Sequence, residues 1–280
     1  MFSIALDTSS TDNALLLQLS NELTARSGIV THVLHQTDST NTQLLDTPQT
    51  EHSHEPRALI ALSQTAGRGR RGRAWEQNTT AAAHPAFLGS MAAATTLNPA
   101  TLSTLPLHIG VAVAETLRQW GCTAQIKWPN DLLIGGKKLG GILVETRGFG
   151  HNNTHQSTLA TTWVVMGLGL NWHSAPSLPD RATACVVDNT TKLPDEITAA
   201  AALVGAIHTA WQRVHHSATL HFSAYDALLG QAVMTDTGLE GVACGVNAAG
   251  QLGLRSAASG AVTWIHSGEV SVKVSVKIDG

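Results

Sequence analysis

Residues 67–73 read Gly-Arg-Gly-Arg-Arg-Gly-Arg and directly follow an apolar run at 57–64. The apolar run predicts a strand, and the glycines predict that it ends in a loop whose backbone a ligand can approach closely. Guanidinium groups beside exposed N–H groups are suited to bind phosphate or carboxylate oxygens. The stretch therefore predicts an anion-binding loop between two strands, one that becomes ordered when its ligand arrives.

The same loop matches the dinucleotide-binding pattern Gly-x-Gly-x-x-Gly at Gly67, Gly69 and Gly72. That pattern must open a helix and be followed by an acidic residue about 20 positions later. Here no acidic residue occurs between Glu76 and Glu115. The context excludes a Rossmann nucleotide site and leaves the anion-binding interpretation.

Composition limits the classes of protein that this chain can be. Of its 280 residues 43% are hydrophobic and 13% charged, which is typical of a globular protein. The net charge of −3 argues against general nucleic-acid binding, which needs a basic face. Three widely separated cysteines, no basic and apolar leader and no apolar run of about 18 residues predict a cytoplasmic protein with no membrane contact.

Hydrophobic periodicity predicts alternating helices and strands. A helix at 12–26 places Leu15, Leu16, Leu19 and Leu23 on one side, and a helix at 99–120 carries a regular apolar stripe. Gly135-Gly136 predicts a tight hairpin. Further strands are expected at 29–35, 57–64, 86–94, 124–128 and 161–166, a brief helix follows 38–41, and a longer helix begins at 194.

The expected fold class is α+β, with a central mixed β-sheet and helices packed on one face. Residues 1–229 are expected to form the main domain, with 1–28 as an N-terminal extension. From about residue 230 short strands separated by glycines predict a small β module over 230–280.

Four sequence islands occur in a characteristic order: Asp38-Ser-Thr-Asn41, Gln64 to Trp75, Lys127-Trp-Pro-Asn-Asp131 with Lys138 to Glu145, and Gly167-Leu-Gly-Leu-Asn171. Together they resemble biotin protein ligases, which activate biotin with ATP and attach it to a carrier protein. The resemblance covers 30–280 and implies a class II synthetase-like catalytic domain with a small C-terminal SH3-like barrel. With about 30 residues before the first shared strand, the chain resembles the monofunctional members that lack a DNA-binding domain.

The resemblance assigns a group of residues to biotin. From the residues alone, Ser39, Thr40 and Asn41 would cap a helix, and Gln64 would be a polar strand end. The ureido ring of biotin needs both donors and acceptors, which an amide and hydroxyls supply. The implied biotin-binding residues are Ser39, Thr40, Asn41, Gln64, Gly67, Arg68 and Gly141.

A second group is assigned to ATP and to catalysis. Two anions, the biotin carboxylate and the ATP phosphates, must be brought together, and fixed cations offset their repulsion. Read without the resemblance, the lysines would be solvated strand residues and Trp75 a core residue. The implied ATP and adenylate residues are Arg68, Arg70, Arg71, Trp75, Asn130, Lys138 and Asn171. The implied catalytic residues are Lys138, Arg70 and Asp131, with Lys137 an uninvolved surface neighbour.

No fixed metal site is expected, and Mg²⁺ should accompany ATP, with Asp131 nearby. The 14 histidines lack paired acids or cysteines and are interpreted as surface residues, including His52, His54, His151, His155, His215 and His216.

Two alternatives stay open. A lipoate or octanoate ligase could use the same scaffold, and a nucleic-acid-binding regulator could use the arginine loop. The expected partner is the biotin carboxyl carrier protein of acetyl-CoA carboxylase, without DNA, and the expected state is a monomer or weak homodimer.

Overall fold

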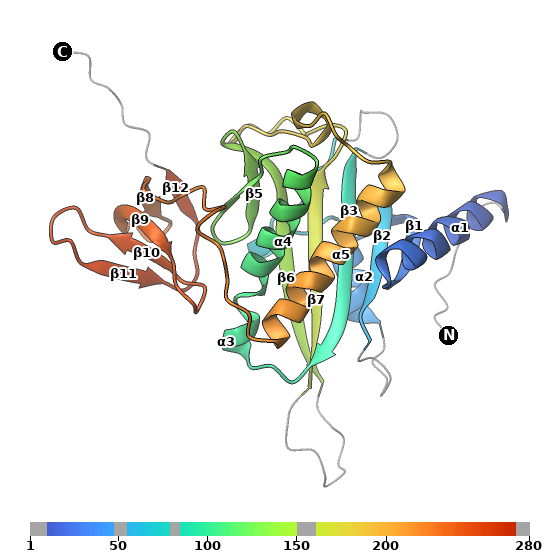
Figure 1. The fold of residues 1–280 in the computed structure, drawn as a ribbon, viewed down its shortest axis with the longest axis horizontal. Helices are drawn as coiled ribbons and strands as arrows, with labels where there is room; N and C mark the ends of the chain where they lie inside the picture. Colours follow the sequence, from blue (N-terminus) through green and yellow to red (C-terminus); the bar gives the residue numbers. More distant parts are fainter. Residues whose placement is uncertain (1–9, 48–54, 79–84, 150–160, 273–280) are drawn as a thin grey trace, which may run out of the picture.

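The computed structural model describes residues 10–47, 55–78, 85–149 and 161–272. Its centre is a seven-stranded sheet in the order β1-β2-β3-β7-β6-β5-β4 (Figure 1). The strands are β1 (Val30–Thr37), β2 (Arg57–Gln64), β3 (Ala86–Thr95), β4 (Gln125–Lys127), β5 (Asp131–Ile134), β6 (Lys137–Phe149) and β7 (Thr161–Asn171). Because β1 and β2 run parallel and the other neighbours antiparallel, the prediction of a mixed sheet is confirmed.

Helices cover both faces of this sheet, so the prediction that they pack on one face is wrong. The larger group is α1 (Ser10–Ser27), α4 (Leu105–Gln119) and α5 (Glu196–His215). The short α2 (Thr40–Asp46) packs on the opposite face, where Leu44 and Leu45 meet Trp163 in a separate small core. Successive strand residues point to opposite faces, and β3 and β7 are apolar on both, so each face needs a cover.

The predicted helix over 99–120 is two helices, α3 (Pro99–Leu102) and α4. The break falls just before Pro106, which lies in the first turn of α4, where proline is tolerated. The predicted apolar stripe is nevertheless buried on both sides of the break. Pro99–Gln119 is apolar and long enough to span a membrane, but 67% of its most apolar window is buried inside the protein, as in a core helix.

The helix predicted at 12–26 is present as α1, but the four leucines expected on one side are not equally buried. Leu16 and Leu23 pack into the main core, whereas the side chain of Leu15 is 57% exposed. The seven-residue interval between Leu16 and Leu23 keeps these two on one face, and Leu15 lies beside it.

The hairpin predicted at Gly135-Gly136 joins β5 to β6. Both glycines have positive φ angles, 54° and 75°, which a two-residue turn of this kind requires. The turn places Asp131 at the start of β5 level with Gly141 on β6. It therefore brings the two segments of this sequence island, Lys127–Asp131 and Lys138–Glu145, side by side.

A second, five-stranded sheet lies on the β5 side of the first (Figure 1). Its strands are β8 (Ala232–Thr235), β9 (Glu240–Val246), β10 (Leu252–Arg255), β11 (Val262–Ile265) and β12 (Val270–Val272), in the order β11-β10-β9-β8-β12. All neighbours are antiparallel. The indole N–H of Trp128 donates to the carbonyl of Gly250 at 2.9 Å and so links this sheet to the main one.

Candidate functional site

A cavity of about 290 Å³ opens over the middle of the main sheet, between the start of α2, strands β3, β6 and β7, and the glycine-arginine turn. Most residues singled out from the sequence line it, although they come from positions 39 to 171. These are Ser39, Thr40, Asn41, Gln64, Arg68, Arg70, Trp75, Asn130, Asp131, Lys138, Gly141 and Asn171. The fold thus gathers separate islands around one space.

The glycine-arginine turn is a compact hairpin-like loop over 67–75. The Trp75 N–H donates to the Gly67 carbonyl at 2.9 Å, and the Gly69 N–H donates to the Arg73 carbonyl at 2.7 Å. At its tip Arg71 and Gly72 have φ angles of 58° and 73°. These angles reverse the chain, and consecutive arginines consequently point in different directions.

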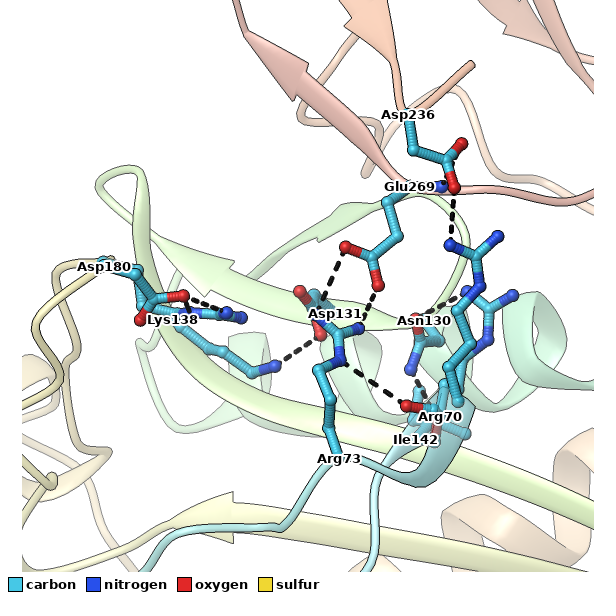
Figure 2. A network of polar contacts seen from close by, with 11 residues as sticks. Arg70, Arg73, Asn130, Asp131, Lys138, Ile142, Asp180, Asp236 and Glu269 are labelled. Atoms are coloured by element: carbon cyan, nitrogen blue, oxygen red, sulfur yellow. Dashed lines mark hydrogen bonds and ion pairs between the residues drawn. The ribbon is translucent and has the colours of Figure 1, made fainter.

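Arg71 and Gly67 were assigned to the ligands, yet neither lines the cavity. Arg71 instead pairs with Asp236 of the second sheet, and Arg73 donates to Glu269 at 3.2 Å (Figure 2). Gly67 lies behind the turn, where an added Cβ would be 3.1 Å from the Gln64 amide nitrogen. The reversed tip directs Arg71 away from the cavity, which the residue order alone does not reveal.

One end of the cavity, the neutral end, is formed by Thr40, Gln64, Ser90 and Asn41. The backbone N–H of Thr40 donates to Gln64 Oε1 at 2.7 Å, and the Thr40 and Ser90 hydroxyls are 2.7 Å apart. Ser90 donates to Asn41 Oδ1 at 2.6 Å. Since Thr40, Ser90 and Asn41 are at most 4% exposed, this end is a buried and internally partnered polar surface.

Glycine at position 167 makes room for this arrangement. A Cβ added to Gly167 on β7 would lie 2.2 Å from Asn41 Oδ1, so any side chain there would displace the Asn41 amide. The two residues belong to different islands, and their contact explains why one island needs a glycine where the other supplies an amide.

The opposite end, the charged end, contains Lys138, Asp131, Arg70 and Asn130. Lys138 Nζ pairs with Asp131 Oδ1 at 2.7 Å, and both side chains are about one-fifth exposed (18% and 22%). Arg70 donates to Asn130 Oδ1 at 3.3 Å (Figure 2). Burial, followed by the nearby Arg71, lowers the pKa of Arg70, although a guanidinium stays cationic at neutral pH. Two cationic side chains, Lys138 and Arg70, therefore face the same part of the cavity.

Trp75 lies between the two ends, flat against the β7 backbone. An added Cβ at Gly169 would be 2.6 Å from the indole, and one at Gly141 would be 3.4 Å from it. Lys138 Nζ is 5.8 Å from the ring centroid. Glycines at these two positions therefore allow an aromatic plane to lie along the cavity wall.

Two buried polar atoms of this site have no hydrogen-bond partner within the described chain: Trp75 Nε1 and Asn171 Oδ1. The Asn171 amide nitrogen, by contrast, donates to the Ala184 carbonyl at 3.0 Å, so the side chain is held with its oxygen free. Buried unpaired groups are costly unless something satisfies them. One free donor and one free acceptor are therefore available to a bound molecule.

A wider groove of about 590 Å³ adjoins the charged end and extends towards the second sheet. It is polar and contains Lys127, whose pKa is lowered by burial. The two cavities share Arg70, Arg73, Asn130, Asp131, Lys138, Asp180 and Arg181. This shared wall gives the charged end two openings, one towards the neutral end and one towards the groove.

Three residues of the site were not anticipated as ligand or support residues. Ser90 lies in the middle of a fully buried and mostly apolar strand, where its hydroxyl needs a hydrogen-bond partner inside the protein. Glu145 ends a recognised island and pairs with Arg68 at 2.8 Å. Arg181 comes from a loop that a bridge between Lys138 and Thr183 holds beside β6, and its local sequence carries no such information.

No group of three or more His, Cys, Asp or Glu side chains is close enough to hold a metal ion in the part of the chain that the structure describes. His215 and His216 are exposed at the end of α5. His52, His54, His151 and His155 lie outside the described residues.

Part of this chain is similar in sequence to proteins of a known family. Residues 33–162 match the model of the biotin/lipoate A/B protein ligase family. The bifunctional ligase/repressor BirA of Escherichia coli is 39% identical over 140 residues, covering 50% of this chain and 39% of that protein. The biotin–[acetyl-CoA-carboxylase] ligase of Mycobacterium tuberculosis is 29% identical over 212 residues, or 73% of each chain.

The fold is shared with solved structures as well. Biotin protein ligase from Aquifex aeolicus, in complex with biotin and ATP, superposes with a TM-score of 0.66 at 23% identity. The superposition covers 87% of this chain and 98% of that one, so it includes most of both.

Proposed function

We propose that this chain, whose residues 33–162 carry a domain of the biotin/lipoate A/B protein ligase family, activates biotin with ATP and transfers it to a carrier protein. The first half-reaction would form biotinyl-5′-AMP and release pyrophosphate. The second would pass the biotinyl group to the ε-amine of a lysine, forming an amide and releasing AMP. Relatives named biotin–[acetyl-CoA-carboxylase] ligase support a carboxyl carrier protein as the acceptor.

The observation that carries this proposal is the contrast between the two ends of one cavity. The neutral end offers hydroxyls and amides without a net charge, which suits the ureido ring of biotin. The charged end offers Lys138 and Arg70, which suit a carboxylate beside a phosphate. A molecule with a neutral polar head and a terminal carboxylate fits this order.

In the proposed reaction, Lys138 stabilises the charge that builds on the α-phosphate as the biotin carboxylate oxygen attacks and pyrophosphate leaves. Arg70 would hold the phosphate, and Asp131 would keep Lys138 in place through the 2.7 Å pair. Trp75 would pack against adenine, with Asn171 Oδ1 and Trp75 Nε1 meeting the nucleotide's polar atoms.

Mg²⁺ would bind together with ATP, whose phosphates would supply some of its ligands, so the protein need not supply all of them. The shared wall supplies two carboxylates, Asp131 and Asp180, each already paired with a cation. Magnesium in nucleotide enzymes is bound by one or two carboxylates together with substrate phosphates, and these residues fit that requirement. The metal would neutralise phosphate charge.

The carrier lysine would approach through the groove beside the second sheet, because this groove opens directly onto Lys138 and Asp131. Free thiols at Cys122, Cys185 and Cys244, together with the proposed use of ATP, support a cytoplasmic location.

Calorimetric titration with biotin and lipoate in parallel tests the proposal. The dithiolane ring of lipoate cannot satisfy the neutral end, and buried polar groups left unpaired reject such a ligand strongly. We expect biotin to bind at least roughly 100-fold more tightly than lipoate. Equal affinities, or preference for lipoate, would remove the biotin assignment in favour of the lipoate alternative.

A further inference from the structure

Glu145 on β6 contacts two of the predicted biotin-binding residues although it does not line the cavity. One carboxylate oxygen accepts from Asn41 Nδ2 at 2.9 Å, and the other pairs with Arg68 Nη2 at 2.8 Å. The side chain is 20% exposed, so most of it is packed behind the cavity wall. Both oxygens of the carboxylate are therefore used to hold other side chains.

The Asn41 amide has a single acceptable orientation in these surroundings. Its nitrogen faces the Glu145 carboxylate and, at 3.2 Å, the Leu143 carbonyl, which are both acceptors only. A reversed amide would place an oxygen against two acceptors. Asn41 Oδ1 must consequently face Ser90, at 2.6 Å.

Counting protons then fixes the direction of every hydroxyl at the neutral end. Ser90 has one O–H and gives it to Asn41 Oδ1, which has no proton to offer. The 2.7 Å contact between Ser90 and Thr40 must therefore use the Thr40 proton. Gln64 Oε1 accepts from the Thr40 backbone N–H at 2.7 Å and also lies 3.0 Å from the Thr40 hydroxyl, so the Thr40 proton stays between two acceptors of the neutral end. Both hydroxyl protons are thus used inside the neutral end, and only lone pairs of these hydroxyls are left for a ligand.

We propose that Glu145 is a positioning residue that, through Asn41, fixes the hydroxyl protons of the neutral end so that this end accepts hydrogen bonds from a ligand's N–H groups. The inference rests on the proposed function, since the ureido ring of biotin presents two such N–H groups. The Gln64 amide, with its oxygen taken by Thr40, then offers its nitrogen to the ureido carbonyl. Glu145 thus determines which groups of the neutral end accept hydrogen bonds from the ring, although it does not contact the ring itself.

Exchanging the amide of Asn41 and the carboxylate of Glu145 between the two positions tests this role. Asn41→Asp places a carboxylate against Glu145, and we expect biotin affinity to fall roughly 10- to 100-fold. Glu145→Gln leaves one acceptor for two donors, and we expect a smaller loss. In the double variant Asn41→Asp/Glu145→Gln the introduced amide donates to the introduced carboxylate, which still accepts from Ser90. Biotin affinity should then recover to within about tenfold of wild type.

Calorimetry gives these affinities, and circular dichroism and melting temperatures show that each variant is folded. A second readout compares biotin with an analogue methylated on the ureido nitrogen. Wild type and the double variant should prefer biotin strongly, whereas Asn41→Asp should lose most of this preference. Glu115→Gln, which breaks a remote Glu115–Arg213 pair of the same 2.8 Å length, should change neither quantity.

The outcomes separate the two proposals. If wild type does not bind biotin, the proposed function fails. If wild type binds biotin but the folded double variant is no better than Asn41→Asp, the positioning role of Glu145 is overturned. If Asn41→Asp does not fold, Glu145→Gln decides through the ratio of its affinities for biotin and for the methylated analogue. A ratio equal to that of wild type overturns the positioning role, and a smaller ratio supports it.

Discussion

The two ends of the cavity are built in different ways. At the neutral end, Thr40, Ser90 and Asn41 come from α2 and β3, are buried, and are already hydrogen-bonded to one another. At the charged end, Arg70 lies on a turn, and beside it, at the junction of the two ends, Trp75 Nε1 is still unpaired within the described chain. A surface that is complete before binding selects its ligand, whereas a surface with free donors and cations is completed by the ligand. We therefore assign recognition to the neutral end and chemistry to the charged end.

The largest expected effect concerns Lys138 at the charged end. Lys138→Ala should slow biotin-dependent pyrophosphate release by roughly 100- to 1,000-fold, because it removes a fixed charge at the reacting phosphate. Lys137→Ala is the matched control, since Lys137 is exposed on the same strand. Near-normal pyrophosphate release by a folded Lys138→Ala variant would show that Lys138 has only a structural role.

The next effect concerns Trp75, at the junction of the two ends. Gly169→Ala places a Cβ 2.6 Å from the indole and should displace it. If Trp75 packs on adenine, ATP affinity should fall roughly 5- to 100-fold, the range for loss of a base–aromatic stack. Gly148→Ala on β6 is the control, because a Cβ added there meets no neighbouring atom within 4 Å. Equal ATP affinity in both variants would show that Trp75 does not pack against the nucleotide.

A third prediction compares neighbouring arginines of the turn. Arg70→Gly should raise the dissociation rate of biotinyl-5′-AMP about tenfold, because a cavity-facing cation is lost. The released adenylate should then biotinylate an unrelated protein in the same tube. Arg71→Gly, at a position whose φ of 58° suits glycine, should have little effect, since Arg71 pairs with Asp236 outside the cavity. Equally fast dissociation of biotinyl-5′-AMP from both variants would show that Arg71 also binds the adenylate.

The smallest effect concerns the link between the turn and the second sheet. The hydrogen bond from Arg71, followed by that from the Glu269 backbone, lowers the pKa of Asp236. A depressed carboxyl pKa stabilises the link above the unfolded value of 3.8, and this contribution is lost as the pH falls through the depressed value. Asp236→Asn should imitate that loss at pH 7 and speed tryptic cleavage of the turn by less than about fivefold, as expected for an exposed pair. No change in cleavage would show that the pair does not hold the turn.

The sequence could predict the charged end better than the neutral one. Arg70 belongs to a glycine-arginine loop whose residue types already indicate anion chemistry, and the resemblance adds Lys138 and Asp131. Ser90 and Arg181 could not be found in that way, because their role depends on which strands and loops become neighbours. Ser90 reaches the site through the pairing of β3 with β2 and β7.

The same limit applies to the fold. Periodicity located nearly every strand of the main sheet, since alternation and turn residues are local signals. The brief helix after 38–41 is predicted, but its position on the second face is not, because the contacts of α2 with Trp163 span more than 100 positions. Periodicity also missed the direction of Arg71, which follows from one positive φ angle.

Isotope exchange between pyrophosphate and ATP in the wild-type protein tests the central claim most directly. It reports formation of the adenylate itself, so it requires both ends to act on one molecule. We predict exchange that depends on biotin and is at least about 100-fold slower with lipoate or octanoate. Exchange that runs equally well with lipoate, or that needs no added acid, would contradict the division between a selecting end and a reacting end.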